Sequence, residues 1–331
     1  FGYATAPKAY YDAITGWFRR RHGWQIRPEW VLHTTGVIPA LSAVIKALTQ
    51  PGDKVLIQTP VYNHFFTSIH NSGCQAAESP LVYRDNTYTI DFDDLERKAA
   101  DPAVKLMLLC NPHNPAGRVW TPAELHRIGE LCLRHDVVVV ADEIHCELVM
   151  PGFRYTPFAS LCEEFERRSV TCTSPSKAFN LAGLQVANIF AADAALRARI
   201  GHSLQMNETG EIGPFAIEAL IAAYDEGAEW LDALNEYLHG NYRFSREYFD
   251  RNLPQYPVLP LEGTYLVWVD CRASGLTSDE LETKLLEEAK LRINPGAIYG
   301  EAGRDFIRLN IACPRKLLAE GLDRLRKVLK R

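Results

Sequence analysis

Two apolar runs, at residues 104–110 and 137–141, restrict the fold of this chain more than any other feature, and only Lys105 interrupts the first of them. Runs of this length without polar alternation are typical of strands in a parallel sheet that helices cover on both faces. Between them, Thr121 and Glu124 form a capping-box pattern that predicts a helix as far as about His135. A strand, a helix and a strand in this order predict a doubly wound α/β architecture.

The alternation continues as far as Asn207 and then changes. Further strands are predicted at residues 30–33, 54–58, 169–173 and 186–191, and further helices at 10–22 and 37–48. After Asn207, the pattern predicts helices at 212–224 and 230–252, strands at 264–269 and 306–311, a capped helix from Thr277 between them, and a last basic helix. We therefore predict a large α/β domain over residues 1–210, connecting helices over 211–240 and a smaller α+β domain over 241–331. Because the chain begins inside what reads as structured sequence, we also expect an N-terminal arm before Phe1.

Charge and cysteine content exclude several classes of protein. The 331 residues carry 36 basic and 41 acidic side chains, a net charge of −5, without a basic stripe. This balance argues against nucleic acid or an anionic membrane as a partner, and no apolar run is long enough to span a bilayer. The N-terminus shows no secretory signal pattern. Eight scattered cysteines without a CxxC pair predict reduced, mostly buried thiols in a cytoplasmic protein, and neither a metal site nor disulfides.

Residues in the loops after the predicted strands are candidate site residues, because ligands of parallel sheets bind beyond the carboxyl ends of the strands. These residues are Gly36, Val37, Ile38, Tyr62, Asn114, Asp142, His145, Ser174, Ser176 and Lys177. We expect them to meet at one edge of the sheet. Together they suit an anionic, aromatic cofactor that carries an aldehyde. The histidines His113, His135 and His202 are instead interpreted as solvent-facing or capping residues.

The phosphate of such a cofactor has a predicted place at residues 36–38. A strand ends and a helix begins there, and the free N–H groups of a helix start attract anions. Ser174 and Ser176 are predicted to donate hydroxyls to the same group. The simpler alternative for this segment is an ordinary helix cap.

Asp142 and Lys177 also have two interpretations each. Asp142 is either a helix cap or the partner of a pyridinium nitrogen, and a charge-assisted hydrogen bond to that nitrogen would depress its pKa. Lys177 is either a solvated surface lysine or a Schiff-base lysine. Asn114 stands between two prolines, where turn chemistry is the alternative role. Arg308, in a late strand, is predicted to bind the carboxylate of an amino acid through two N–H donors of its guanidinium.

In order and spacing these residues resemble the fold-type I enzymes that depend on pyridoxal 5′-phosphate (PLP), the aspartate aminotransferase superfamily. An Asn-Pro-x-Gly element, a strand-end Asp, a Ser-x-x-Lys and a late Arg follow one another at intervals of 28, 35 and 131 residues, counted from Asn114. The resemblance covers essentially the whole chain. A nearer likeness, to cystathionine β-lyase and cystalysin-like C–S lyases, is carried by NPHNPAGRVW at 111–120, ADEIHCEL at 141–148 and SKAFNLAG at 176–183.

The resemblance implies a fold of type I, with a large domain around a mostly parallel, doubly wound sheet and a smaller C-terminal α+β domain. It implies that Lys177 binds PLP as a Schiff base, that Asp142 pairs with the ring nitrogen and that Asn114 bonds the phenolic oxygen.

The resemblance also assigns the surroundings of the cofactor. His145 would lie near the ring, Tyr62 would stack on it, and Arg308 would hold the substrate carboxylate. Tyr3 would reach the phosphate in the neighbouring subunit of a homodimer. Many aminotransferases have an arginine where Gln185 stands here, so phosphate binding would depend on the other groups.

The implied activity is α,β-elimination from a cysteine-type amino acid, either cystathionine, cysteine or an S-conjugate, to pyruvate, ammonia and a thiol. Lys177, Tyr62 or Tyr3 would protonate the departing sulfur. A PLP-dependent aminotransferase is the first alternative. A PLP-binding regulatory or carrier-dependent module cut from a larger protein is the second.

Overall fold

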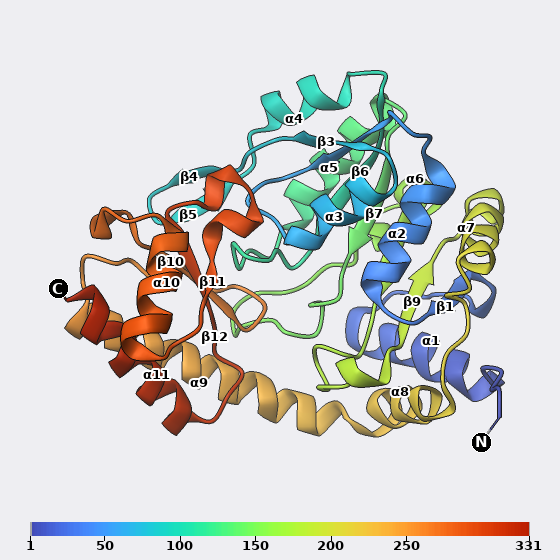
Figure 1. Cartoon of the computed structure of the whole chain (residues 1–331). Helices are drawn as coiled ribbons and strands as arrows, with labels where there is room; N and C mark the ends of the chain where they lie inside the picture. The colour runs from blue at the N-terminus through green and yellow to red at the C-terminus, as the bar shows by residue number, and fades with distance from the viewer. Residues whose placement is uncertain (1, 331) are drawn as a thin grey trace.

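The computed structural model describes residues 2–330, so that Phe1 and Arg331, the outer ends of the predicted domain ranges, lie outside it. Figure 1 shows a larger lobe built around a seven-stranded sheet and a smaller lobe built around a three-stranded sheet. The long helix α9 (Ala228–Asn252) runs from one lobe to the other.

The large sheet has the order β1-β9-β8-β7-β6-β2-β3. Its strands are β1 (Val31–Thr34), β2 (Lys54–Ile57), β3 (Gln75–Glu78), β6 (Val104–Cys110), β7 (Val138–Asp142), β8 (Ser169–Thr173) and β9 (Ala187–Phe190). Only β9 runs against its neighbours, β1 and β8, and the other pairs are parallel. The helices around it are α1 (Lys8–His22), α2 (Val37–Leu48), α3 (Asn63–Asn71), α4 (Phe92–Ala99), α5 (Pro122–Arg134), α6 (Glu163–Arg167), α7 (Ala194–Met206) and α8 (Pro214–Glu226). The prediction of a mostly parallel, doubly wound sheet is confirmed.

From Leu106 onward the apolar run in β6 is continuous because both faces of the sheet are covered. Leu106 and Leu108 pack into a core with side chains of α2, α3 and α7. Met107 and Leu109, which point the other way, pack into a second core with side chains of α4 and α5. Alternate residues of a strand point to opposite faces, so between two helical layers no solvent-facing position is left after Lys105, the exposed second residue of β6.

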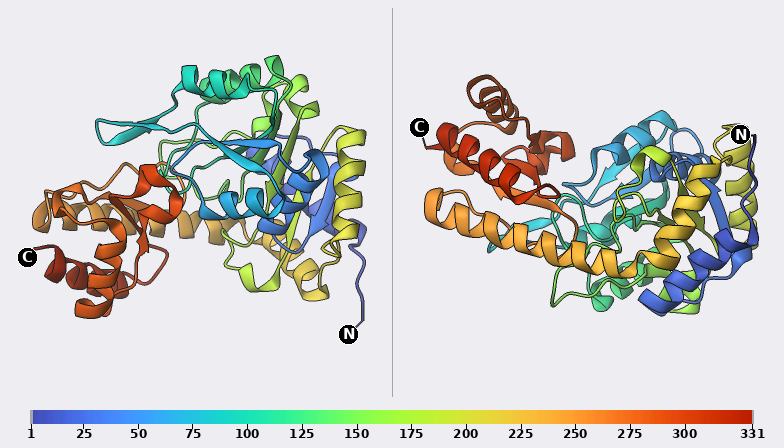
Figure 2. Two further views of the ribbon diagram at one scale, coloured as in Figure 1. Left: turned by 45° about the horizontal axis from the view of Figure 1, so that its top comes forward. Right: turned by 90° about the horizontal axis from the view of Figure 1, so that it is seen from below.

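The smaller lobe is an α+β unit. Its sheet has the order β10 (Leu266–Asp270), β12 (Phe306–Asn310), β11 (Asn294–Pro295), and helices α10 (Ser278–Ala289) and α11 (Arg315–Leu329) share its core with side chains of α9. Figure 2 shows α9 passing under the larger lobe before it reaches this unit. The predicted capping boxes begin α5 and α10, so both predicted helix starts are confirmed. A short hairpin, β4 (Val82–Arg84) with β5 (Thr87–Thr89), was not predicted.

Two further sequence-based expectations concern the chain as a whole. All eight cysteines are free, and six of them are buried, as predicted. Among residues 2–330, no helix combines the length and the apolar character needed to cross a membrane.

Candidate active site

A cavity of about 320 Å³ lies at the carboxyl ends of the parallel strands, against β12 of the smaller lobe. The structure brings ten of the predicted residues to its wall: Gly36, Val37, Ile38, Tyr62, Asn114, Asp142, His145, Ser176, Lys177 and Arg308. They come from the ends of different strands, so the topology of the sheet gathers residues that lie far apart in the sequence.

One end of the cavity is suited to an anion. Helix α2 begins at Val37 directly after β1, and no side chain caps it, since its N-cap residue is Gly36. The N–H groups of Val37 and Ile38 are therefore available at the positive end of the helix dipole. Ser176 also lines the cavity.

Ser174 does not have the predicted phosphate contact. It is buried outside the cavity wall, and its hydroxyl donates to the carbonyl of Val186 at 2.6 Å. The same oxygen accepts a hydrogen bond from the N–H of Ser176 at 3.0 Å. Because a serine has one hydroxyl proton, and it is given to Val186, Ser174 holds the loop before Lys177 and leaves the anion to other groups.

Asp142 ends β7 as a buried carboxyl group at the cavity wall. One carboxyl oxygen accepts a hydrogen bond from the N–H of Ile144 at 3.2 Å. Burial raises the pKa of Asp142 to about 7, although the N–H of Ile144 and the nearby Lys177 lower it in part. Among the described residues no cation forms an ion pair with this carboxyl group, so a cationic N–H in the cavity would find a strong acceptor here.

Arg308 crosses from the smaller lobe to the cavity. Its guanidinium donates to the side-chain oxygens of Asn114 at 2.9 Å and Asn294 at 3.3 Å, and it lies 4.9 Å from the ring centre of Tyr299. No carboxylate among residues 2–330 forms an ion pair with it, and its buried Nε has no partner. The amide oxygen of Asn114 faces Arg308, which leaves the amide N–H group of Asn114 to donate elsewhere in the cavity.

Three more groups on the cavity wall lack a strong partner. Within the described part of the chain, no hydrogen bond or ion pair holds the amine of Lys177 or the hydroxyl of Tyr62, whose pKa burial raises to about 12. His145 is buried with its Nδ1 unpartnered. Burial, with Lys177 and Arg308 nearby, lowers the pKa of His145 to about 3, which keeps its ring neutral.

Two predictions about single residues were not confirmed: one stays a prediction and the other was wrong. Tyr3 is almost fully exposed and lies away from the cavity wall, so its predicted role in a neighbouring subunit stays a prediction. The interpretation of His113 as solvent-facing or capping was wrong. Its side chain is fully buried edge-on against Trp120, and burial lowers its pKa to about 4.

The cavity wall also includes residues that the sequence pattern did not single out, among them Cys110, Tyr265 and Asn310. Tyr265 stands two residues after Gly263, at the start of the predicted strand 264–269. An aromatic residue there reads as an ordinary strand residue. Only the approach of the smaller lobe to the sheet edge, which local patterns do not encode, places it in the site.

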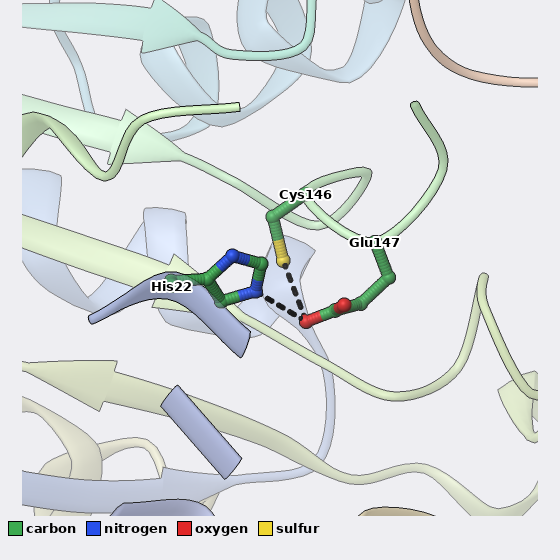
Figure 3. A group of neighbouring side chains, drawn as sticks. All are labelled: His22, Cys146 and Glu147. Carbon is green, nitrogen blue, oxygen red and sulfur yellow. Dashed lines mark hydrogen bonds and ion pairs between the residues drawn. The ribbon is translucent and has the colours of Figure 1, made fainter. Parts of the chain in front are cut away.

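A second polar cluster lies between α1 and the turn after β7 (Figure 3). His22 Nε2 is 2.7 Å from a carboxyl oxygen of Glu147, which also accepts from the indole N–H of Trp17 at 2.6 Å and lies 3.7 Å from the sulfur of Cys146. Two ligands of one tetrahedral zinc ion, each at about 2.0–2.1 Å from the metal, stand about 3.3 Å apart. The 2.7 Å separation is therefore a direct hydrogen bond, and the cluster is arranged as a buried hydrogen-bonded pair.

The fold and the cavity together define a class, the fold-type I architecture of PLP-dependent enzymes. Comparison with known proteins agrees: the model of the family "Aminotransferase class I and II" matches residues 2–325. The chain therefore belongs to this family.

Three individual proteins illustrate the similarity. The chain is 43% identical to cystathionine β-lyase PatB of Bacillus subtilis, over 99% of this chain and 85% of that protein. It superimposes on cystalysin of Treponema denticola, a structure that contains PLP, with a TM-score of 0.97 and 37% identity, over 99% of this chain and 84% of that one. A PLP-bound C–S lyase of Staphylococcus hominis gives a TM-score of 0.93 and 31% identity, over 99% and 85%.

Proposed function

We propose that this protein is a PLP-dependent C–S β-lyase that cleaves a cysteine-type amino acid to pyruvate, ammonia and a thiol. One observation carries the proposal: a single cavity presents an uncommitted lysine amine, a buried carboxyl group and an arginine without a carboxylate partner. The similarity to cystathionine β-lyases and to C–S lyases of known structure supports the same activity.

The residues of the cavity fit the cofactor group by group. The uncapped start of α2 and Ser176 would hold the phosphate. Asp142, buried without a cationic partner, would bond the protonated ring nitrogen, and the free N–H group of Asn114 would bond the phenolic oxygen. Lys177 would hold the aldehyde carbon covalently. When bound, PLP supplies an electron sink for charge that develops at the Cα atom of the amino acid.

The remaining residues of the site bind and orient the substrate. Arg308 would take the substrate carboxylate through a fork of two N–H donors, because Asn114 and Asn294 leave its other donors free. Lys177, released by the incoming amine, would remove the Cα proton as general base. Tyr62 and the neutral ring of His145 would flank the cofactor.

The proposal includes a homodimer in which Tyr3 of one subunit reaches the phosphate site of the other. Tyr3 is available for this role because it is exposed and outside its own cavity. The cytoplasmic location predicted from the free thiols belongs to the proposal as well.

A product assay tests the proposed function. The PLP-loaded protein is incubated with L-cystathionine or L-cysteine without a keto-acid acceptor, and pyruvate, ammonia and thiol are measured. We expect repeated turnover to all three products. Conversion of the cofactor to its pyridoxamine form without pyruvate would contradict the proposal and favour an aminotransferase, the activity named for more distant relatives at 26% identity.

A further inference from the structure

Tyr265 stands at the boundary between the cavity and a second hollow of about 480 Å³. The second hollow lies against α9, with Trp230 and Leu234 on its wall. Lys177, Tyr265 and Asn310 are the residues that line both. A substrate held by Arg308, with its Cα next to Lys177, would therefore have Tyr265 close to the path by which a side-chain substituent leaves.

The hydroxyl of Tyr265 is free to act as a proton donor. No hydrogen bond within residues 2–330 engages it, although the ring is held edge-on to His145 with the centres 5.9 Å apart. The amide oxygen of Asn310 accepts from the N–H of Ala312 at 2.8 Å, and an amide is a poor acid. Apart from Lys177, Tyr265 is thus the acidic group shared by the two hollows.

The backbone before Tyr265 supports a functional role. Thr264 is fully buried and has a φ of +71°, a left-handed conformation that β-branched residues avoid at a cost of about 1–3 kcal/mol. Its N–H donates to Leu148 O at 2.7 Å and its hydroxyl oxygen accepts from the N–H of Leu266 at 3.1 Å. The bond from Thr264 holds the segment 264–266 against Leu148. Leu148 belongs to the turn that carries His145, since its N–H donates to the carbonyl of His145 at 2.9 Å. The strained segment fixes the position of Tyr265 against the cavity.

We propose that Tyr265 is the general acid that protonates the departing sulfur, an inference that rests on the proposed C–S lyase function. The Cβ–S bond breaks with its electron pair on sulfur, and the hydroxyl proton of Tyr265 passes to that sulfur, so that a neutral thiol leaves. The phenolate then takes back a proton from the ammonium of Lys177, which holds the proton removed from Cα. Both side chains end in their starting state.

Tyr62, the other phenol on the cavity wall, is less suited to this step. It lines only the first cavity, and after burial the group that shifts its pKa most is Asp142, the predicted partner of the cofactor nitrogen. Tyr62 therefore belongs to the ring side of the site, whereas Tyr265 faces the route of the leaving group.

The test compares two leaving groups on the PLP-loaded holoenzyme. S-methyl-L-cysteine must release a thiolate that needs a proton, whereas β-chloro-L-alanine releases chloride, which needs none. For Tyr265→Phe, we expect kcat/KM on S-methyl-L-cysteine to fall about a hundredfold further than on β-chloro-L-alanine, since general acids contribute about 10²–10⁴-fold. The matched control is Tyr248→Phe, which removes a phenol that donates to Asp323 on the smaller lobe and should keep the wild-type ratio.

A second readout is independent of turnover. Fluorescence titration of the cofactor-free Tyr265→Phe protein should give an affinity for PLP within about threefold of the wild type, because the hydroxyl faces the leaving group. An equal loss of kcat/KM on both substrates, or no loss, would overturn the assignment, as would finding the selective loss in Tyr62→Phe instead. If the wild-type protein released no pyruvate from either substrate, the proposed function itself would fall, and the role of Tyr265 with it.

Discussion

Asp142 is the residue whose environment has the clearest measurable consequence. Burial raises its pKa to about 7 from the usual 3.8, so the folded protein without cofactor binds this proton more tightly than the unfolded chain does. The stability of that form should therefore fall as the pH rises from about 4 to about 7, and the loss should persist above pH 7. The neighbouring Glu143, whose pKa burial also raises to about 7, adds a fall in the same direction.

Asp142→Asn should remove the part of this pH-dependent loss of stability that comes from the Asp142 carboxyl group. Without cofactor, the variant should melt at a higher temperature than the wild type at pH 8, and the two melting temperatures should converge towards pH 4. With PLP bound the order at pH 8 should reverse, because only the wild type makes the charge-assisted bond to the ring nitrogen. Parallel melting curves of the two cofactor-free proteins across this range would show that Asp142 does not titrate as a buried carboxyl group.

Arg308 makes a different prediction, about substrate binding. Arg308→Lys keeps the positive charge but loses the fork of donors that Asn114 and Asn294 hold in place. We expect kcat/KM to fall about 10–100-fold, mostly through a higher KM, since a hydrogen bond to a charged group contributes about 1.5–3 kcal/mol. Steady-state kinetics measures this, and Arg304→Lys, an exposed arginine paired with Glu301, is the matched control. A variant with normal KM would mean that another group binds the carboxylate.

At the scale of elements, the sequence predicts best where local chemistry decides the outcome. The helix starts at Thr121 and Thr277 follow from capping boxes, and β6 follows from a run that only a strand covered on both faces tolerates. The hairpin of β4 and β5 was missed because its partly exposed strands are only three residues long and show no clear period.

The residues of the candidate site likewise include some that the sequence predicts and some that it does not. Asp142 and Lys177 were found because Asp142 ends one strand and Lys177 lies in the loop after the next, and the topology of a parallel sheet brings strand ends together. Tyr265 and Asn310 were missed because the contact between the two lobes places them on the cavity wall. Ser174 was misjudged because the sequence does not show that Val186 O takes its only proton.

The cluster of His22 and Glu147 joins the end of α1 to the turn after β7, so it should stabilise the position of His145 as well as the fold. Glu147 is buried, and His22 holds its pKa below the usual value against the effect of burial. Glu147→Ala would leave a buried imidazole and the indole N–H of Trp17 without their acceptor.

We expect Glu147→Ala to lower the free energy of unfolding by at least about 2 kcal/mol, because two buried N–H donors lose their acceptor and each orphaned group costs about 1–3 kcal/mol. Urea unfolding of the PLP-loaded protein measures it. Glu163→Ala, which removes an exposed carboxylate paired with Arg167, should change the same quantity by less than about 0.5 kcal/mol. Similar effects of the two substitutions would mean that the cluster around Glu147 is solvated and does not anchor the turn.

At the scale of the whole molecule, the proposed homodimer can be tested through complementation. Lys177→Ala lacks the lysine that holds the cofactor, and Tyr3→Ala lacks the tyrosine proposed to act in the neighbouring subunit. If Tyr3 acts across the interface, a hybrid dimer has one site with both residues intact and one site with neither. Refolding the two variants together in equal amounts makes about half of the dimers hybrids, so about a quarter of all sites should be complete.

The mixture should then show up to about a quarter of the wild-type activity, above the sum of the separate variants. If Tyr3 served its own subunit, every site with an intact Lys177 would still lack its tyrosine, and mixing would restore nothing. Sedimentation of the wild type provides the independent check, since a monomer at the assay concentration would rule out a shared site whatever the mixture does.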